Sequence, residues 1–261
     1  MGGAAMTDVF TLYHWEPNAN SGKPILALKE KGAPFVSRFI DMTKFEHHTP
    51  EYLAINPLGV IPAATHGDLK LYESTAIMEY IDDAFDGPPL RPADPVARWR
   101  MRWWMKFMDE YLAPAVSMGA WARGRARPQM TPEEDAAMKK RIAAIPQKER
   151  QLSWTKATYG TFAPGELEES ARKAAYGIGM METQLSRHTW LAGDDYSLAD
   201  INCFNTTYFL PMRPDSGVSD EKTPHLMEWL RRIYERPAAK AAWDLGRTFT
   251  AERLAHLARP T

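Results

Sequence analysis

The chain has 261 residues, enough for one large or two modest domains with a sizeable core. Its 32 basic and 33 acidic residues give a formal charge of −1, which argues against binding to nucleic acid or to an acidic membrane surface. One cysteine, Cys203, excludes an internal disulfide, and no apolar run approaches the roughly 18 residues of a membrane span, so we expect a soluble, cytoplasmic protein.

The first predicted elements alternate between strand and helix. Residues 9–13 predict a short buried strand, followed by a turn-rich loop and then by a helix that begins at Ser21 and ends at Gly32. Residues 35–40 predict a second strand. A loop that carries Lys44 follows it.

The stretch from residue 56 to residue 74 predicts a bend, a hairpin and a helix. Pro62 cannot donate to a sheet ladder, so it predicts a bend that is compatible with a cis peptide bond and leaves the backbone of Ile61 facing outward. Residues 66–68 predict the hairpin turn, and Ser74 is predicted as the N-cap of an amphipathic helix. A free backbone at Ile61, a carboxylate at Glu73 and helix N-terminal donors suit an extended peptide with its own amine and carboxylate.

These elements divide the chain into two predicted domains. Strand, helix, strand, hairpin and helix form a thioredoxin-like order, so we predict a small α/β domain over residues 6–85, with Met6 as the natural start. Four prolines mark residues 86–95 as a linker. The remainder, residues 96–261, is predicted to be all-helical, with capping boxes at Thr131 to Glu134 and Ser197 to Asp200.

The pair Ile61-Pro62, followed by Glu73-Ser74, resembles the signature of the glutathione transferase family; the alternative is a surface loop with a proline stop and a capped helix. The resemblance implies the glutathione transferase fold, which is an α/β thioredoxin-like N-terminal domain plus an all-α C-terminal domain. It also implies a homodimer that uses glutathione as co-substrate and needs no metal.

The same resemblance assigns residues to the parts of glutathione. Glu73 and Ser74 would hold the γ-glutamyl end, and the Ile61 backbone would pair with the cysteinyl unit. Lys44 and His47 would meet the glycyl carboxylate, although His47 as a solvated loop residue, with His48 facing inward, is an alternative. Val60 and Pro62, which flank Ile61, are also assigned to the glutathione site. Many relatives carry Gln or Lys where this chain has Val60, so a side-chain contact to glutathione is missing or replaced.

Glutathione brings its own thiol, so the protein needs only to favour the thiolate. Lowering a thiol pKa of about 8.5 by two units requires about 2.7 kcal/mol. One hydrogen bond to a charged group contributes roughly 1.5 to 3 kcal/mol, so a single donor at a helix start suffices. The family places that donor between the first strand and the first helix, where this chain offers Ser21 and Asn20, with Tyr13 and His14 as lesser candidates. For Ser21 a plain N-cap is the alternative.

The resemblance further implies a pocket for an apolar aromatic substrate between the domains. Trp15 follows the first strand, beside the expected sulfur. An aromatic and methionine stripe in the first long helix is the other candidate lining, and packing in the core is the alternative for each of its members. The predicted pocket residues are Trp15, Trp104, Met108, Tyr111, Met118 and Trp121.

Several segments, among them residues 17–21, 90–95 and 221–224, are similar to bacterial β-etherases that cleave lignin-derived aryl ethers, closest to the S-selective branch. The implied reaction is attack of the glutathione thiolate on the carbon β to a benzylic ketone, which expels a phenol and leaves a thioether. A general glutathione transferase or peroxidase acting on other electrophiles, and a noncatalytic glutathione-binding protein, are the alternatives.

Three other patterns have structural explanations. The arginine and tryptophan mixture at residues 98–104 fits a solvated helix face backed by core aromatics better than a nucleic-acid surface. Asp194, Asp195 and Asp200 are expected to form a loop and a helix cap rather than a metal site. Cys203 is expected to be an inert core thiol.

Overall fold

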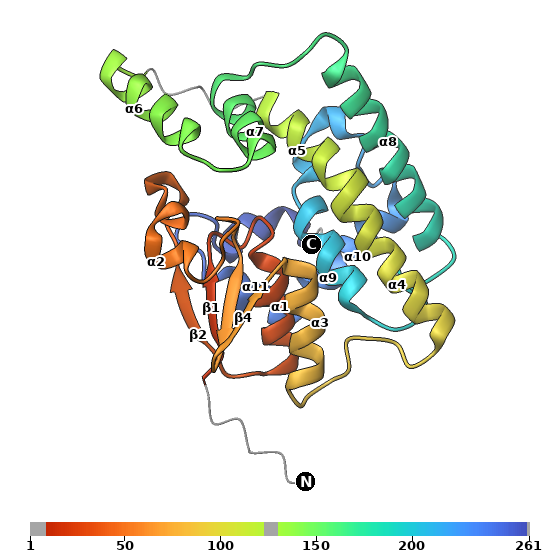
Figure 1. Ribbon diagram of the computed structural model, residues 1–261. Coiled ribbons are helices and arrows are strands. Elements are labelled where there is room, and N and C mark those ends of the chain that lie inside the picture. Colours follow the sequence, from red (N-terminus) through yellow and green to blue (C-terminus); the bar gives the residue numbers. More distant parts are fainter. Residues whose placement is uncertain (1–8, 123–129, 260–261) are drawn as a thin grey trace. The chain divides into compact units, whose positions relative to one another are not determined.

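The computed structural model describes residues 9–122 and 130–259, so the predicted start at Met6 lies outside the described residues. A four-stranded sheet and three helices form the first part of the described chain (Figure 1). These elements are β1 (Thr11–His14), α1 (Gly22–Lys31), β2 (Val36–Phe39), α2 (Pro50–Leu53), β3 (Ala63–His66), β4 (Leu69–Tyr72) and α3 (Ser74–Ala84), with short 3-10 turns η1 (Met42–Lys44) and η2 (Glu46–His48) before α2.

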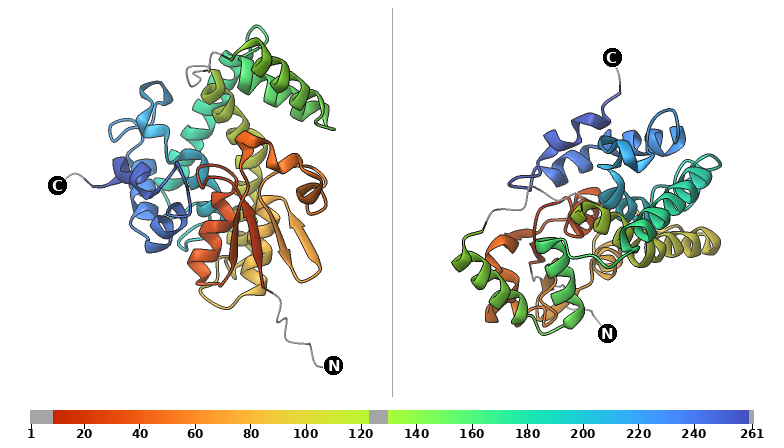
Figure 2. Two further views of the ribbon diagram at one scale, coloured as in Figure 1. Left: turned by 90° about the vertical axis from the view of Figure 1, so that its left-hand side faces the viewer. Right: turned by 90° about the horizontal axis from the view of Figure 1, so that it is seen from above.

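The sheet has the strand order β2-β1-β3-β4, with β1 parallel to β2 and antiparallel to β3. Side chains alternate along β1, where Leu12 and His14 are buried while Thr11 and Tyr13 are half-buried. Helices α1 and α3 pack against each other on one face of the sheet (Figure 1; Figure 2). On the other face, Tyr13 packs into a small cluster built on Tyr52 of α2. This is the thioredoxin-like fold that the element order predicted.

From α4 onward the described chain is helical, as the sequence predicted. Pro95, after the N-cap Asp94, starts the first of these helices, and both predicted capping boxes form. The helices are α4 (Pro95–Phe107), α5 (Ala113–Ala122), α6 (Pro132–Ala143), α7 (Lys148–Tyr159), α8 (Glu166–Leu185), α9 (Leu198–Thr207), α10 (Pro224–Tyr234) and α11 (Pro237–Trp243), with short 3-10 segments η4 (Leu210–Met212), η5 (Pro214–Ser216) and η6 (Ala251–Leu257).

The long helix of the all-α part is interrupted once. A π-helix, η3 (Met108–Leu112), connects α4 to α5. Pro114 lies just after it, and because proline lacks the N–H that an α-helix would use, a local change in the hydrogen-bond pattern is expected there. The π-helix thus ends two residues before Pro114.

The chain forms two compact units, which are not divided at the linker. One unit comprises the residues up to Met108 together with those from Gly179 onward, and the other runs from Asp109 to Ile178. In the first unit α1 packs on α9 and α11 as well as on α3, and α4 packs on α9. The division into domains at residues 86–95 stays a prediction.

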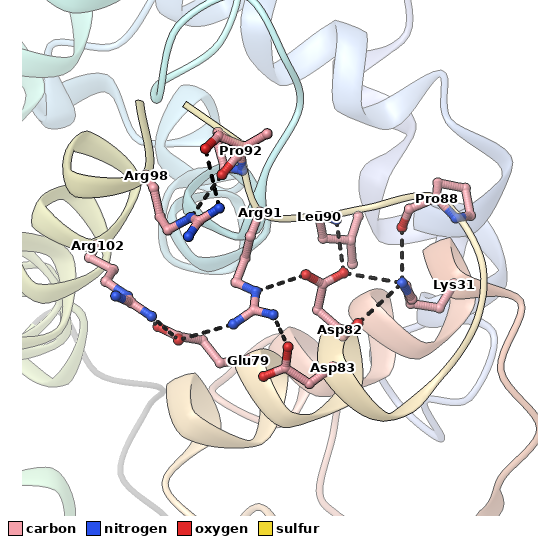
Figure 3. A network of polar contacts seen from close by, with 11 residues as sticks. Lys31, Glu79, Asp82, Asp83, Pro88, Leu90, Arg91, Pro92, Arg98 and Arg102 are labelled. Carbon is pink, nitrogen blue, oxygen red and sulfur yellow. Dashed lines mark hydrogen bonds and ion pairs between the residues drawn. The ribbon is translucent and has the colours of Figure 1, made fainter. Parts of the chain in front are cut away.

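The linker is fixed to the first unit by a polar network around Asp82 of α3 (Figure 3). Asp82 accepts hydrogen bonds from the N–H of Leu90 at 2.9 Å, from Nε of Arg91 at 2.9 Å and from Nζ of Lys31 at 3.1 Å. Burial alone would raise the pKa of Asp82, but these donors outweigh it and lower the pKa. Lys31 also donates to the carbonyl of Pro88 at 3.2 Å, so α1, α3 and the linker share one buried ion pair.

Two further findings concern the described residues only. None of their helices is both long and apolar enough to cross a bilayer. Asp200 completes the predicted capping box at the start of α9. Among the described residues, no group of three His, Cys, Asp or Glu side chains is placed to hold a metal ion. Cys203 is buried in α9.

Candidate functional site

The predicted glutathione-binding segments meet at one edge of the sheet. Because β1 and β3 are antiparallel, with Tyr13 opposite Ala63, the end of β1 lies beside the start of β3. Tyr72, the last residue of β4, pairs with the same Ala63. The loop after β1, the Ile61-Pro62 bend before β3, and Glu73 after β4 therefore share this edge, and the loop after β2 leaves from it as well.

The bend at Ile61-Pro62 contains the cis peptide bond that the sequence suggested. The strand ladder begins only at Ala63, so the peptide groups of Ile61 are not used in the sheet. Behind the bend, the Val60 carbonyl accepts hydrogen bonds from the Tyr52 hydroxyl at 2.6 Å and from Nδ2 of Asn56 at 2.8 Å. Val60 thus holds the bend in place through its backbone. Sequence reasoning missed Tyr52 and Asn56, because a bond across an irregular loop has no periodic signal.

Glu73 and Ser74 stand at the N-terminus of α3, one residue away from the predicted capping arrangement. The N-cap is Glu73, and Ser74 is the first helical residue, which corrects the expectation that Ser74 caps the helix. Glu73 has φ 70° and ψ 108°, a left-handed backbone that costs a non-glycine residue about 1 to 3 kcal/mol. Such strain is found at binding sites, where it aims a group at a ligand. Here the exposed side chain of Glu73 directly precedes the N-terminus of α3, an end of a helix that favours a bound anion.

The loop after β1 folds back tightly onto the start of α1. A Cβ atom on Gly22 would lie 2.0 Å from the Pro17 carbonyl oxygen, so only glycine fits there. Ser21 occupies the N-cap position without capping the helix; its Oγ instead accepts the Trp15 N–H at 2.9 Å. The Ser21 side chain therefore does not cap the helix, and over the described residues its hydroxyl proton is donated to no other group. Ser21 is buried and Asn20 is exposed.

Peptide groups in this loop are a third source of donors. Over the described ranges, the N–H groups of Asn20 and Ser21 donate to no other atom. They stand at the positive end of α1, where an anion is favoured. The Ser21 hydroxyl, the Asn20 amide and these two N–H groups are thus all available to a sulfur anion near this loop.

Of the two lesser candidates for thiol activation, the His14 ring is hydrogen-bonded on both nitrogens, while the Tyr13 ring packs against another aromatic ring. Nδ1 of His14 lies 2.7 Å from the Trp15 carbonyl, which can only accept, so Nδ1 carries the proton. Nε2 then accepts from the Ser37 hydroxyl at 2.6 Å. Burial lowers the pKa of His14, although the Trp15 carbonyl and Glu16 act in the opposite direction, and this favours the neutral ring. Tyr13 packs edge-on against Tyr52, as its place in the strand suggested.

Lys44 and His47 differ sharply in exposure. The Lys44 side chain is 71% exposed and lies 3.4 Å from Asp41, so it is free to turn toward an added anion. His47 has no exposed surface, which rules out the solvated-loop alternative; its ring stacks on Phe45 and touches His48. His48 packs over Gly59, where a Cβ atom would lie 2.7 Å from the imidazole. Contact of Lys44 and His47 with glutathione stays a prediction.

The predicted pocket residues fall in both compact units. Trp15 is half-buried beside Phe39, with ring centroids 5.0 Å apart. Trp104 and Met108 are buried in the first unit, as the core alternative expects. The other three predicted pocket residues lie half-buried in the second unit, and these are Tyr111, Met118 and Trp121. A surface cavity of about 450 Å³ between α6 and α7 is lined by none of these residues.

The thioredoxin-like fold has a cis-proline bend and a Glu73-Ser74 pair in which Glu73 has a positive φ, and an all-helical part follows it. This combination defines the glutathione transferase class. Comparison with known protein families supports this assignment. The N-terminal domain of glutathione S-transferase matches residues 8–83, and the C-terminal domain matches residues 117–237. The chain belongs to the glutathione transferase family.

Individual relatives are similar along nearly the whole chain. Protein LigF from Sphingobium sp. (strain NBRC 103272 / SYK-6) is 41% identical over 89% of this chain and 92% of its own length. The probable glutathione S-transferase GSTF1 of Oryza sativa subsp. japonica is 28% identical over 85% of this chain and 90% of its own.

Solved structures agree with these relatives. The crystal structure of beta-etherase LigF from Sphingobium sp. strain SYK-6 matches with a TM-score of 0.83 and 40% identity, over 90% of this chain and 99% of that one. Glutathione transferase F7 from Populus trichocarpa matches with a TM-score of 0.66 and 27% identity, over 90% and 97% of the two chains.

Proposed function

We propose that this protein is a glutathione-dependent β-etherase, which cleaves lignin-derived α-keto β-aryl ethers. The observation that carries the proposal is the 41% identity to LigF over 89% of the chain, since the matching solved structure is a beta-etherase. The site supports it, because the chain keeps a peptide-binding edge and offers donors for a sulfur anion at the same edge.

Glutathione is proposed to bind along the sheet edge in an extended form. Its γ-glutamyl carboxylate is placed at the N-terminus of α3, beside Ser74, and its α-amino group beside the carboxylate of Glu73. The cysteinyl unit pairs with the peptide groups of Ile61, which the strand ladder leaves unused. Lys44 and His47 are proposed for the glycyl carboxylate; Lys44 reaches it by leaving Asp41, and His47 acts only if its ring becomes accessible.

The thiol is proposed to be held as a thiolate by the loop between β1 and α1. The Ser21 hydroxyl accepts the Trp15 N–H, and over the described residues its own proton is not donated elsewhere, so it can be donated to a thiolate. Asn20 and the two peptide N–H groups add to it. Because one charge-assisted bond provides roughly 1.5 to 3 kcal/mol, one or two of these donors account for a thiol pKa near neutrality.

The proposed reaction needs little further assistance. The thiolate attacks the carbon next to the ketone, a carbon–sulfur bond forms, and the carbon–oxygen bond breaks with its electron pair on the phenol oxygen. The adjacent carbonyl activates the carbon, and a phenol with a pKa of about 10 is an adequate leaving group. The protein mainly contributes orientation and a poised sulfur. Trp15 is the proposed first wall of the aromatic pocket. The other candidates from the sequence stay predictions, and they are Trp104, Met108, Tyr111, Met118 and Trp121.

One assay separates this proposal from its alternatives. A fluorogenic α-keto β-aryl ether should release its fluorophore only when both protein and glutathione are present. A general glutathione transferase or peroxidase would leave this ether intact and consume other electrophiles or peroxides. A noncatalytic protein would bind immobilised glutathione and turn over none of these substrates.

A homodimer in the cytoplasm is also proposed. Tyr72 on the edge strand β4 and Val96 and Trp99 on α4 are exposed apolar side chains in the same compact unit. Contiguous exposed apolar patches mark contact surfaces, so these side chains are our candidates for the interface. The mass in solution, measured by light scattering, should be twice that of one chain. Replacing Trp99 with a charged residue should lower it if α4 is at the interface.

A further inference from the structure

Glu16 is a buried carboxylate that the proposed chemistry does not use. It follows Trp15 in the loop after β1 and is 1% exposed. Its oxygens accept the peptide N–H groups of Arg247, Thr248 and Phe249 at 3.0, 3.1 and 3.2 Å. Within the described ranges no lysine or arginine pairs with it. Through these three hydrogen bonds Glu16 anchors a distant segment to the loop between β1 and α1, which we call the catalytic loop.

The anchored segment carries the cationic side chain of Arg247, which lies over the ring of Phe39. Arg247 is exposed, and its guanidinium carbon lies 3.9 Å from the centroid of the Phe39 ring. Phe39 in turn packs against Trp15, the proposed first wall of the pocket. Across the residues that the structure describes, no carboxylate pairs with the Arg247 guanidinium. The arginines that hold the fold, such as Arg91 and Arg236, do have carboxylate partners.

The sheet order places this cation relative to the proposed glutathione site. Phe39 ends β2 and lies opposite His14, the last residue of β1. Strands β3 and β4, which lead to Ile61 and Glu73, lie on the other side of β1. The sulfur donors follow β1 itself. Arg247, over Phe39, therefore lies on the opposite side of β1 from Ile61 and Glu73, where Trp15 and Phe39 offer aromatic surface.

We propose that the Arg247 guanidinium binds the oxygen of the departing phenolate, with Glu16 as the positioning residue that holds the segment at the catalytic loop. This inference rests on the proposed function. During the reaction, negative charge moves from sulfur to the phenol oxygen, while the total charge is unchanged. A cation at the oxygen end stabilises the transition state more than the ground state, and that difference accelerates the step. The phenolate takes its proton from water after release.

The test varies the leaving group. Wild type, Arg247→Gln and Arg247→Lys are compared on α-keto β-aryl ethers whose phenols span a wide range of pKa, and the logarithm of kcat/KM is plotted against that pKa. Arg247→Gln should lose about tenfold with a phenol of ordinary basicity and little with a nitrophenol, so its slope becomes steeper. Arg247→Lys should restore part of the loss. The dissociation constant of glutathione should not change.

Two further variants complete the design. Glu16→Gln should steepen the slope as Arg247→Gln does, because it frees the same segment. Arg253→Gln is the matched control, since Arg253 is also an exposed arginine over an aromatic ring, that of Phe249, and its slope should equal that of wild type. If Glu16→Gln does not fold, Arg247→Gln alone decides the matter.

The outcomes separate this inference from the function on which it rests. Parallel plots for wild type and Arg247→Gln would overturn the role of Arg247 while leaving the etherase activity standing. Weaker glutathione binding with an unchanged slope would assign Arg247 to the tripeptide carboxylate instead, and would also overturn it. A wild-type protein that cleaves none of the ethers would overturn the proposed function, and the inference with it.

Discussion

Replacing Ser21 with alanine tests which group keeps the glutathione sulfur ionised. The Ser21 Oγ accepts the Trp15 N–H at 2.9 Å, so its own proton is the only donor that the mutation removes. One hydrogen bond to a charged group is worth roughly 1.5 to 3 kcal/mol, which equals about one to two pKa units. The pKa of the bound thiol should rise by that amount, as measured by titrating the ultraviolet absorbance of the thiolate in the complex.

Asn20→Ala is the matched comparison, because Asn20 neighbours Ser21 but is exposed. It should move the thiol pKa by less than Ser21→Ala does. Ser21→Ala should also lower the free energy of unfolding by about 1 to 3 kcal/mol, because the Trp15 N–H loses its acceptor. If the thiol pKa is the same in wild type and in both variants, side-chain donation is refuted and the peptide N–H groups hold the anion.

Three other predictions concern binding and stability. Glu73→Gln should weaken glutathione binding by about tenfold in calorimetry, because an ion pair with the α-amino group becomes a neutral contact; unchanged affinity would remove Glu73 from the site. Burial raises the pKa of Asp200 to about 6, above the ordinary 3.8, so the folded state binds more protons between these values, and this stabilisation is lost as the pH rises through 6. The free energy of unfolding of wild type relative to Asp200→Asn should therefore fall by about 1.3 kcal/mol from pH 5 to pH 7 in urea titrations, and a rise would contradict the assignment. Gly59→Ala should cost about 1 to 3 kcal/mol more than Gly32→Ala; both have positive φ, but only Gly59 faces a side chain, that of His48, and equal costs would show that the contact is harmless.

Local signals made much of the fold predictable. The proline at position 62, the turn at residues 66–68 and the capping boxes act within a few residues, and each is found in the structure. The N-cap of α3 is Glu73 and not the predicted Ser74, because Glu73 adopts a left-handed backbone that side-chain preferences do not predict for a glutamate. The π-helix before Pro114 likewise depends on how a whole helix packs.

Long-range pairings were the part that the sequence could not reveal. Glu16 binds peptide groups 231 to 233 positions later, and no spacing rule connects residues that far apart. The burial of His47 also depends on the folding of the whole loop around Gly59. The edge of the sheet could be placed from element order alone, because antiparallel and parallel pairing dictate which loops meet.

The most direct test of the proposed chemistry is to follow both products of one turnover. Protein, glutathione and an α-keto β-aryl ether should yield equal amounts of free phenol and of a glutathione thioether, detected together by mass spectrometry. Phenol released without the thioether, or an ether left intact by fully folded protein that has bound glutathione, would contradict it.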